Sequence, residues 1–230
     1  MIKLVLTDVD GTLTSGRDTY EIDLEAIQAL RKLEKHGIKV GLVSGNSYPV
    51  LRGLYTYFNF HGGLVAENGC VVYYNKVMNK VCEEIDKSLI REFESRFNVV
   101  GTWQNEFKYC DLTFIPPTLN DEMIKWAKSR GLYIKTSGYA IHISKSYSGK
   151  GIGVKKLIEL HNLSKYEVLG IGDSSTDKEF LEEVGIKVVV ENADEEVKKI
   201  ANYITTNKSG KGVVEVAQKI LKGEINGGRD

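Results

Sequence analysis

Near its start the chain reads Ile2-Lys3-Leu4-Val5-Leu6-Thr7-Asp8-Val9-Asp10-Gly11-Thr12. The first six of these residues form a nearly continuous apolar run, which is typical of a parallel strand buried on both faces. Residues two apart in a strand point the same way, so Asp8 and Asp10 are two carboxylates at its end. Open α/β sheets bind ligands at the carboxyl ends of their strands. The stretch therefore predicts a site as well as a strand, although a solvated Asp-Gly turn is the ordinary alternative.

Four more runs of this kind follow along the chain, with helical patterns between them. Strand and helix therefore alternate, which predicts an α/β fold with a parallel sheet. In the first helical pattern Leu24, Ile27, Leu30 and Leu33 are predicted on one apolar stripe, and Gly37 is predicted to end the helix. The predicted strands span residues 2–7, 38–43, 168–171, 187–190 and 203–206, and the predicted helices span 23–36, 152–161, 177–184, 194–202 and 213–221.

Between residues 83 and 148 the pattern changes. His142 and Ser144 alternate with Ile141 and Ile143, which is typical of an antiparallel sheet with one open face. We therefore expect a small α+β domain over residues 83–148, inserted into an α/β domain made of residues 1–82 and 149–230. The expected elements of the insert are a helix at 88–97, a strand near 109–115, a helix at 120–130 and two strands around Gly138.

The composition excludes several classes of protein. Hydrophobic residues make up 42% of the chain, and 31 basic and 31 acidic side chains cancel to a net charge of zero. This balance argues against a strongly basic nucleic-acid binder. No apolar run approaches the roughly 18 residues of a membrane helix. We therefore expect no nucleic-acid partner and no membrane association. The sequence does not specify the oligomeric state, and both a monomer and a homodimer stay open.

The cysteines bear on the compartment. Cys70, Cys82 and Cys110 are odd in number and form no C-x-x-C pair. This argues against a disulfide framework and against a zinc site. It favours a reducing environment, so we expect a cytoplasmic protein.

A second strand end carries Ser44-Gly45-Asn46. A hydroxyl and free backbone N–H groups at such a junction can bind an anion, although a simple helix cap is the alternative. Lys150 opens a later helix and can bring a positive charge to a phosphate. Its surroundings match neither of the two nucleotide-loop fingerprints, so alone it would indicate little.

A third strand end carries Gly172-Asp173, with Asp177 one helical turn further on. Two such carboxylates could supply oxygen ligands to Mg²⁺. Alternatively, Asp177 only stabilises the start of its helix. Together the four motifs supply a nucleophile, an acid/base, a metal site and positive charge, which are the requirements of phosphoryl transfer.

In these motifs the chain resembles the haloacid dehalogenase superfamily of phosphohydrolases. The insert resembles the C2 cap of that superfamily, and Glu67-Asn68-Gly69 resembles its Cof-type branch. The length and Ser44-Gly45-Asn46 most resemble the archaeal phosphoglycolate phosphatases. Thr176 departs from the pattern, because many relatives have Asn there. The matching residues, in order, are Asp8-Val9-Asp10-Gly11-Thr12, Ser44, Lys150, and Gly172-Asp173 with Asp177.

The resemblance implies a Rossmann-like parallel-sheet core with a small α+β cap, and it implies a role for each motif residue. Asp8 would be the nucleophile, Asp10 the general acid/base, and Thr12 would orient Asp10. Mg²⁺ would be the cofactor. The expected phosphate-binding residues are Ser44, Gly45, Asn46 and Lys150, and the expected metal ligands are Asp8, the main-chain carbonyl of Asp10, Asp173 and either directly or indirectly Asp177.

The resemblance also implies the substrate class, a small phosphorylated metabolite, with 2-phosphoglycolate expected and a sugar phosphate as the alternative. A phosphomutase, a phospho-accepting signalling module and an inactive binding protein remain as rivals. The loop at residues 14–20 is too short for a lid, so the insert would close over the site. On the insert, His142 is a candidate substrate contact, and an exposed strand histidine is the alternative.

Overall fold

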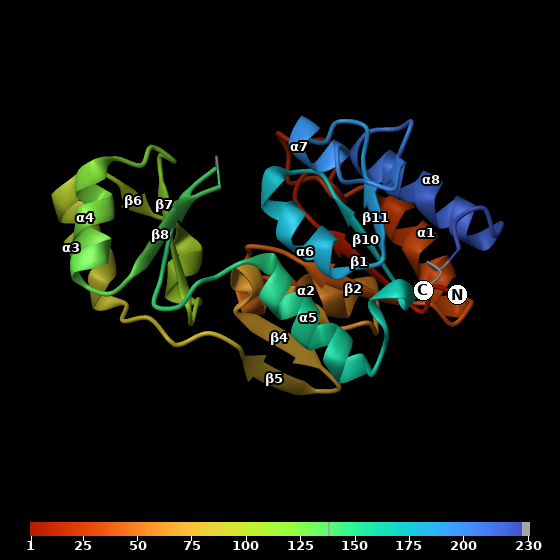
Figure 1. Ribbon diagram of the computed structural model, residues 1–230, viewed down its shortest axis with the longest axis horizontal. Helices are drawn as coiled ribbons and strands as arrows, with labels where there is room; N and C mark the ends of the chain where they lie inside the picture. The colour runs from red at the N-terminus through yellow and green to blue at the C-terminus, as the bar shows by residue number, and fades with distance from the viewer. Residues whose placement is uncertain (138, 227–230) are drawn as a thin grey trace.

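The computed structural model describes residues 1–137 and 139–226 and contains two sheets (Figure 1). The larger sheet has the order β12-β11-β10-β1-β2-β3-β4-β5. Its strands from β12 to β3 are parallel, and β4 and β5 add an antiparallel hairpin. The predicted parallel α/β sheet is confirmed. The strands are β1 (Leu4–Asp8), β2 (Lys39–Val43), β3 (Leu64–Ala66), β4 (Val71–Tyr74), β5 (Val77–Lys80), β10 (Val168–Gly172), β11 (Ile186–Val189) and β12 (Tyr203–Ile204).

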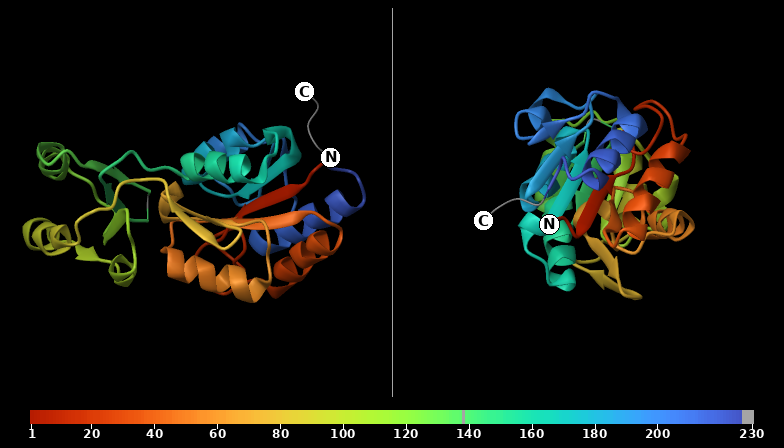
Figure 2. Two further views of the ribbon diagram at one scale, coloured as in Figure 1. Left: turned by 90° about the horizontal axis from the view of Figure 1, so that it is seen from below. Right: turned by 90° about the vertical axis from the view of Figure 1, so that its right-hand side faces the viewer.

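Helices cover both faces of this sheet (Figure 2). One face carries α1, α2 and α8, and the other carries α5 and α6; α1 packs on α8 and α5 packs on α6. The helices are α1 (Leu24–Lys35), α2 (Tyr48–Phe58), α5 (Lys150–His161), α6 (Lys178–Glu183), α7 (Glu195–Lys198) and α8 (Ser209–Leu221), with short 3₁₀ turns η1 (Glu67–Gly69), η3 (Lys165–Glu167) and η4 (Ser175–Asp177). Among the described residues, no helix combines the length and the hydropathy needed to cross a lipid bilayer.

Helix α1 shows how local sequence sets its ends and its buried face. The Asp23 carboxylate accepts hydrogen bonds from two backbone N–H groups of the first turn, and Gly37, with φ of 81°, follows the last turn. Leu30 and Leu33 are fully buried. Leu24 was predicted on the same stripe, but it is 70% exposed. The reason is geometric, since residues nine apart lie on opposite sides of a helix with 3.6 residues per turn.

The smaller sheet lies beyond the carboxyl ends of the parallel strands, at the left of Figure 1. It is antiparallel, in the order β6-β7-β9-β8, and α3 and α4 cover its outer face. Its elements are α3 (Ser88–Phe97), β6 (Val100–Gly101), η2 (Trp103–Glu106), β7 (Asp111–Ile115), α4 (Asp121–Ser129), β8 (Tyr133–Thr136) and β9 (Ile141–Ser144). We call residues 83–148 the cap and the remainder the core.

The cap has its own cluster of buried side chains, including Phe93, Trp126, Ile141 and Ile143. The isoleucines of β9 therefore point into the cap, while His142, on the opposite face of the strand, contacts Asn68 of the core. The exact domain boundaries stay a prediction. Gly138, around which two strands were expected, lies outside the described residues, as do residues 227–230.

The prediction for the cysteines is wrong for one pair. Cys70 lies just before β4 and Cys82 just after β5, and a disulfide joins them across Cα atoms 4.9 Å apart. The hairpin register brings them together, since the N–H of Val81 donates to the Cys70 carbonyl. Sequence spacing alone did not reveal that register. Cys110 is free and buried, and the cysteines no longer support a reducing compartment.

Candidate active site

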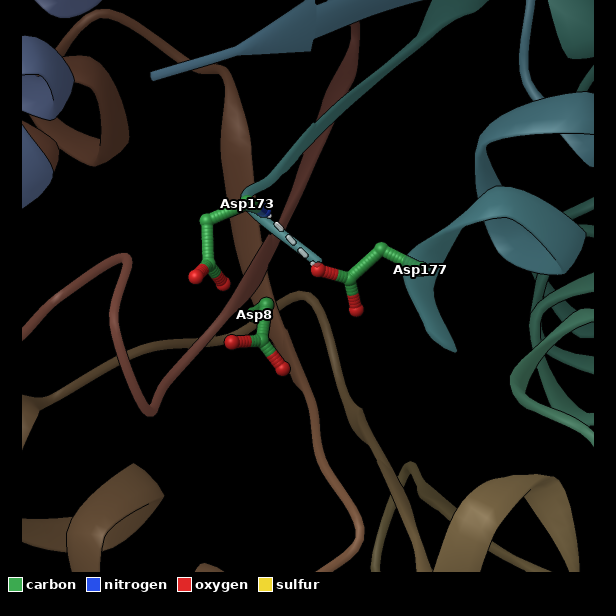
Figure 3. A group of neighbouring side chains, drawn as sticks. All are labelled: Asp8, Asp173 and Asp177. Carbon is green, nitrogen blue, oxygen red and sulfur yellow. Dashed lines mark hydrogen bonds between the residues drawn. The ribbon is translucent and has the colours of Figure 1, made fainter. Parts of the chain in front are cut away.

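The four motifs meet at one edge of the large sheet. β1 lies between β10 and β2, so Asp8, Asp173 and Ser44 leave three adjacent strand ends. Figure 3 shows the carboxylates of Asp8, Asp173 and Asp177 pointing toward a shared space. Their oxygens lie within 4.8 Å of one another, and all three residues are buried. The topology of a parallel sheet is the reason for this convergence.

Lys150 inserts its amine among these carboxylates. Its Nζ donates to Asp8 Oδ1 and to Asp177 Oδ1, each at 2.6 Å. The Lys150 side chain reaches this position because the first turn of α5 packs closely against η1. A Cβ added to Gly69 would stand 1.9 Å from the carbonyl oxygen of Gly149, so only glycine fits there.

Burial and mutual repulsion govern the charges of this cluster. Desolvation, followed by the charge of Asp177, raises the pKa of Asp8 well above its ordinary value. The same two causes raise the pKa of Asp173 to about 6. Burial alone would lower the pKa of Lys150, but Asp177 and Asp8 outweigh it and raise that pKa. The lysine therefore stays charged and holds Asp8 in place.

Asp177 has both carboxylate oxygens engaged. Oδ1 accepts from Lys150, and Oδ2 accepts from the backbone N–H groups of Asp173 at 2.9 Å and Ser174 at 3.0 Å. The first of these two bonds is drawn in Figure 3. Asp177 thus fixes both the lysine and the turn that presents Asp173. Thr176, where many relatives have Asn, places its hydroxyl 2.7 Å from that of Ser174.

Arg17 is a site residue that the sequence interpretation missed. It lies in the loop after β1, and its Nε donates to Asp173 Oδ2 at 2.6 Å. Its Nη2 donates to the Asp173 main-chain carbonyl, and its Nη1 donates to Asp194 at 2.8 Å. That the loop is too short for a lid stays a prediction, but its Arg17 side chain reaches Asp173. A single arginine in a polar loop carries no sequence signal for such a contact.

The expected contact between Thr12 and Asp10 is corrected by the structure. The Thr12 hydroxyl donates to Asp173 Oδ1 at 3.1 Å, and a hydroxyl has only one hydrogen to donate. Asp10 is held instead by Asn46, whose Nδ2 donates to Asp10 Oδ2 at 2.8 Å. Asp10 is exposed to solvent, yet desolvation by the surrounding protein raises its pKa.

The donor set fits a hard divalent cation. Three carboxylates converge, and they outnumber the two cations that contact them, Lys150 and Arg17. Carboxylate oxygens are the ligands that Mg²⁺, Ca²⁺ and Mn²⁺ prefer. The residues at the ends of β1 and β10 therefore form a candidate metal centre.

The inner face of the cap completes a cavity of about 190 Å³ above the site. His142 is one of its lining residues and is only 8% exposed, so the alternative of an exposed strand histidine is wrong. Both parts of the chain bury it: its Nδ1 lies 3.1 Å from Asn68 Nδ2 of the core and 3.2 Å from Asp111 Oδ2 of the cap. The other cavity residues are Asn68, Lys135, Thr136, Ser137, Lys150, Ser175, Thr176 and Glu179.

Asp111 anchors this buried polar cluster of the cap. Its Oδ2 accepts from Lys108 Nζ at 2.8 Å, and Asn68 of the core donates to the same oxygen. Burial would raise the pKa of Asp111, but Lys108 and His142 outweigh it and lower that pKa. The charged aspartate therefore fixes the ring of His142 at the wall of the cavity.

Comparisons with known proteins agree with this geometry. The family model for haloacid dehalogenase-like hydrolases matches residues 5–100 and 107–216. The phosphoglycolate phosphatase of Sulfolobus acidocaldarius is 67% identical over 98% of this chain and all of the relative. Phosphoglycolate phosphatase 1 of Saccharolobus solfataricus is 59% identical over 99% of both chains.

Solved structures share the fold. A crystal structure of a Thermoplasma acidophilum protein superposes with a TM-score of 0.83 at 28% identity, over 96% of this chain and 99% of that one. A haloacid dehalogenase-like hydrolase from Bacteroides thetaiotaomicron gives a TM-score of 0.80 at 20% identity, over 96% of this chain and all of that one. The family match and the two curated relatives show that this chain belongs to the haloacid dehalogenase-like hydrolases.

Proposed function

We propose that the chain is a Mg²⁺-dependent phosphomonoester hydrolase that converts 2-phosphoglycolate and water to glycolate and phosphate. One observation carries the chemistry: the buried Asp8 carboxylate is paired at 2.6 Å with Lys150, which itself lines the small cavity under the cap. A carboxylate nucleophile needs a cation beside it to meet an anionic phosphate. The names of the two relatives at 67% and 59% identity support the substrate.

In the first step, an oxygen of Asp8 attacks phosphorus. An O–P bond to Asp8 forms and the bond from phosphorus to the glycolate oxygen breaks. Asp10 donates its proton to that leaving oxygen, and its raised pKa supports this role. In the second step, Asp10 takes a proton from water, which attacks the aspartyl phosphate and releases phosphate, regenerating Asp8.

Four residues would bind the transferring phosphoryl group. Lys150 supplies charge, Ser44 its hydroxyl, and the turn at Gly45 and Asn46 supplies donors. The Ser44 hydroxyl lies close to Asp10, since Asn46 Nδ2 contacts both side chains. The site thus presents donors to the phosphate oxygens and a proton donor to the leaving oxygen.

Asp8, the Asp10 main-chain carbonyl and Asp173 would hold Mg²⁺. When bound, Mg²⁺ supplies positive charge that offsets the repulsion between two like charges about 4 Å apart, roughly 4 kcal/mol at an effective dielectric of about 20. Asp177 would support this set from behind, because both of its oxygens already hold Lys150 and the turn before η4.

The cavity limits the size of the substrate. Its volume of about 190 Å³ lies below the roughly 300–1,000 Å³ of typical ligand pockets, so it suits a small metabolite better than a nucleotide. From the cap, Lys135 and His142 line the same cavity as Lys150, and their N–H groups suit a second anionic group on the substrate, such as a carboxylate. This arrangement supports 2-phosphoglycolate, which carries one anionic group at each end.

We also propose a cytoplasmic location, because a charged metabolite of this kind does not cross a bilayer unaided. Fractionation of cells with an antibody against the chain would test it. Recovery in the membrane or extracellular fraction would contradict it.

The test is phosphate release from a panel of phosphomonoesters, with and without Mg²⁺. We expect the highest kcat/KM on 2-phosphoglycolate, loss of turnover in EDTA, and at least a roughly thousandfold loss in Asp8→Asn. Asp18→Asn, a change of an exposed carboxylate in the following loop, is the matched control and should remain active. If a sugar phosphate has the highest kcat/KM, the proposed hydrolysis of a phosphomonoester stands, but 2-phosphoglycolate is not the substrate. No release from any compound, by folded protein, would overturn the proposal.

A further inference from the structure

One side chain of the cap forms two hydrogen bonds to the core next to the site. Gln104 lies in η2, and its Oε1 accepts from the backbone N–H of Ser47 at 2.6 Å. Its Nε2 donates to Asn46 Oδ1, also at 2.6 Å. Asn46 and Ser47 form the turn between β2 and α2. Both ends of one cap amide are therefore bound to the same turn of the core.

The bound Asn46 amide faces the acid/base carboxylate. Its Nδ2 donates to Asp10 Oδ2 at 2.8 Å and to Ser44 Oγ at 2.9 Å. An amide has an acceptor on one side and two donors on the other. Since Gln104 donates to the Asn46 oxygen, it keeps the Asn46 nitrogen directed at Asp10.

We propose that Gln104 is a positioning residue, through which the cap seated on the core holds Asp10 in its working orientation. The inference rests on the proposed function in one respect, the acid/base role of Asp10. Gln104 acts through Asn46 and requires no contact of its own with the substrate. A cap lifted from the core would release Asn46, so proton transfer is coupled to cap seating.

The sharpest perturbation is Gln104→Glu, which keeps the shape and removes the donor. A carboxylate can still accept from Ser47, but it can only accept from Asn46. It therefore attracts Nδ2 of Asn46 and turns Oδ1 toward Asp10, where two acceptors oppose each other.

We expect Gln104→Glu to lower kcat about tenfold, with KM changed less than about twofold. Glu106→Gln is the matched control, because it changes one charge on an exposed residue of the same 3₁₀ turn. The control should keep wild-type kcat. Thermal melting of both variants checks that the cap remains folded. A Gln104→Glu enzyme with wild-type kcat would overturn the inference.

A double-mutant cycle separates positioning from a general structural role. Asn46→Ala removes the group through which Gln104 acts. In that background, Gln104→Glu should lower kcat by less than about twofold more, since coupled residues are not additive. A further tenfold loss would show that Gln104 acts elsewhere and would overturn the inference.

Two outcomes distinguish this inference from the proposed function. If the wild type hydrolyses 2-phosphoglycolate or p-nitrophenyl phosphate and Gln104→Glu has the same kcat, the inference is wrong and the proposed function stands. If the wild type is folded but hydrolyses neither compound, the proposed function is wrong. In that case a crystal structure of Gln104→Glu decides the contact. Asn46 Nδ2 beyond about 3.5 Å from Asp10 Oδ2 supports the inference, and an unchanged contact overturns it.

Discussion

Replacing Lys150 by methionine tests the electrostatic account of the site directly. Each ion pair of Lys150, at 2.6 Å, has a gross attraction of roughly 6 kcal/mol at an effective dielectric of about 20. Desolvation of the ammonium offsets part of it. Removing one partner of a buried pair costs about 3–5 kcal/mol, because the other charge stays buried and unpaired. For a chain of this length that loss corresponds to a fall in Tm of roughly 10 °C.

The loss should depend on pH in a defined direction. Desolvation and Asp177 raise the pKa of Asp173 to about 6 in the folded protein, and they raise that of Asp8 as well. Without Lys150 these values rise further. The folded state then binds protons that the unfolded state releases, so protonation stabilises it as pH falls. The variant should melt far below wild type at pH 8 and closer to it at pH 5.

The assay is differential scanning calorimetry in EDTA at both pH values. Lys156→Met is the matched control: the same helix carries it, its side chain is 42% exposed, and it pairs with Glu159 only at 3.5 Å. That change should alter the free energy of unfolding by less than about 0.5 kcal/mol. If Lys150→Met melts within about 2 °C of wild type at pH 8, the buried cation does not hold this site together.

Three further changes probe other parts of the fold. Cys70→Ala should lower the free energy of unfolding by about 3 kcal/mol, because it removes a disulfide that closes a loop with a sequence separation of 12. If a reductant leaves the Tm of the wild-type protein unchanged, this prediction is wrong. Gly69 has φ of 95°, and an added Cβ would meet a backbone oxygen at 1.9 Å, so Gly69→Ala should lower the free energy of unfolding in urea by more than about 3 kcal/mol. Gly37→Ala is the control and should cost about 1 kcal/mol, because its added Cβ has no described neighbour within 4 Å. Equal losses in the two variants would refute the packing argument. Asp111→Asn should cost about 3 kcal/mol at pH 7, and the gap to wild type should close as pH falls below about 4, through the lowered pKa of Asp111; a constant gap would contradict it.

The sequence predicted the parts of the fold that depend on local pattern. The apolar run before Asp8 is fully buried as β1, and the order of parallel strands brings the motif residues to one edge. The β4–β5 hairpin was missed because its signal is weak. Asn75 and Lys76 form its two-residue turn with φ of 48° and 66°, where Asn-Gly is the usual indicator.

The contacts that tune the site could not be predicted, because they join distant residues without any shared pattern. Arg17 and Asp173 are 156 residues apart, and Gln104 and Asn46 are 58 apart. The role of Thr12 was assigned wrongly for the same reason. Its nearest carboxylate in the sequence is Asp10, whereas its hydroxyl donates to Asp173.

The chain order of the site residues has a consequence for protein synthesis. Asp8 leaves the ribosome early, and Lys150 follows 142 residues later. At about 5–20 residues per second, roughly 7–28 s pass before the lysine exists. During that interval β1 has no β10 beside it, Asp8 lacks its counter-ion, and Asp173 and Asp177 have not yet been synthesised. A nascent or prematurely terminated chain therefore lacks a complete site and should have no phosphatase activity. Activity should begin only after the last third of the chain is synthesised and β10 pairs with β1.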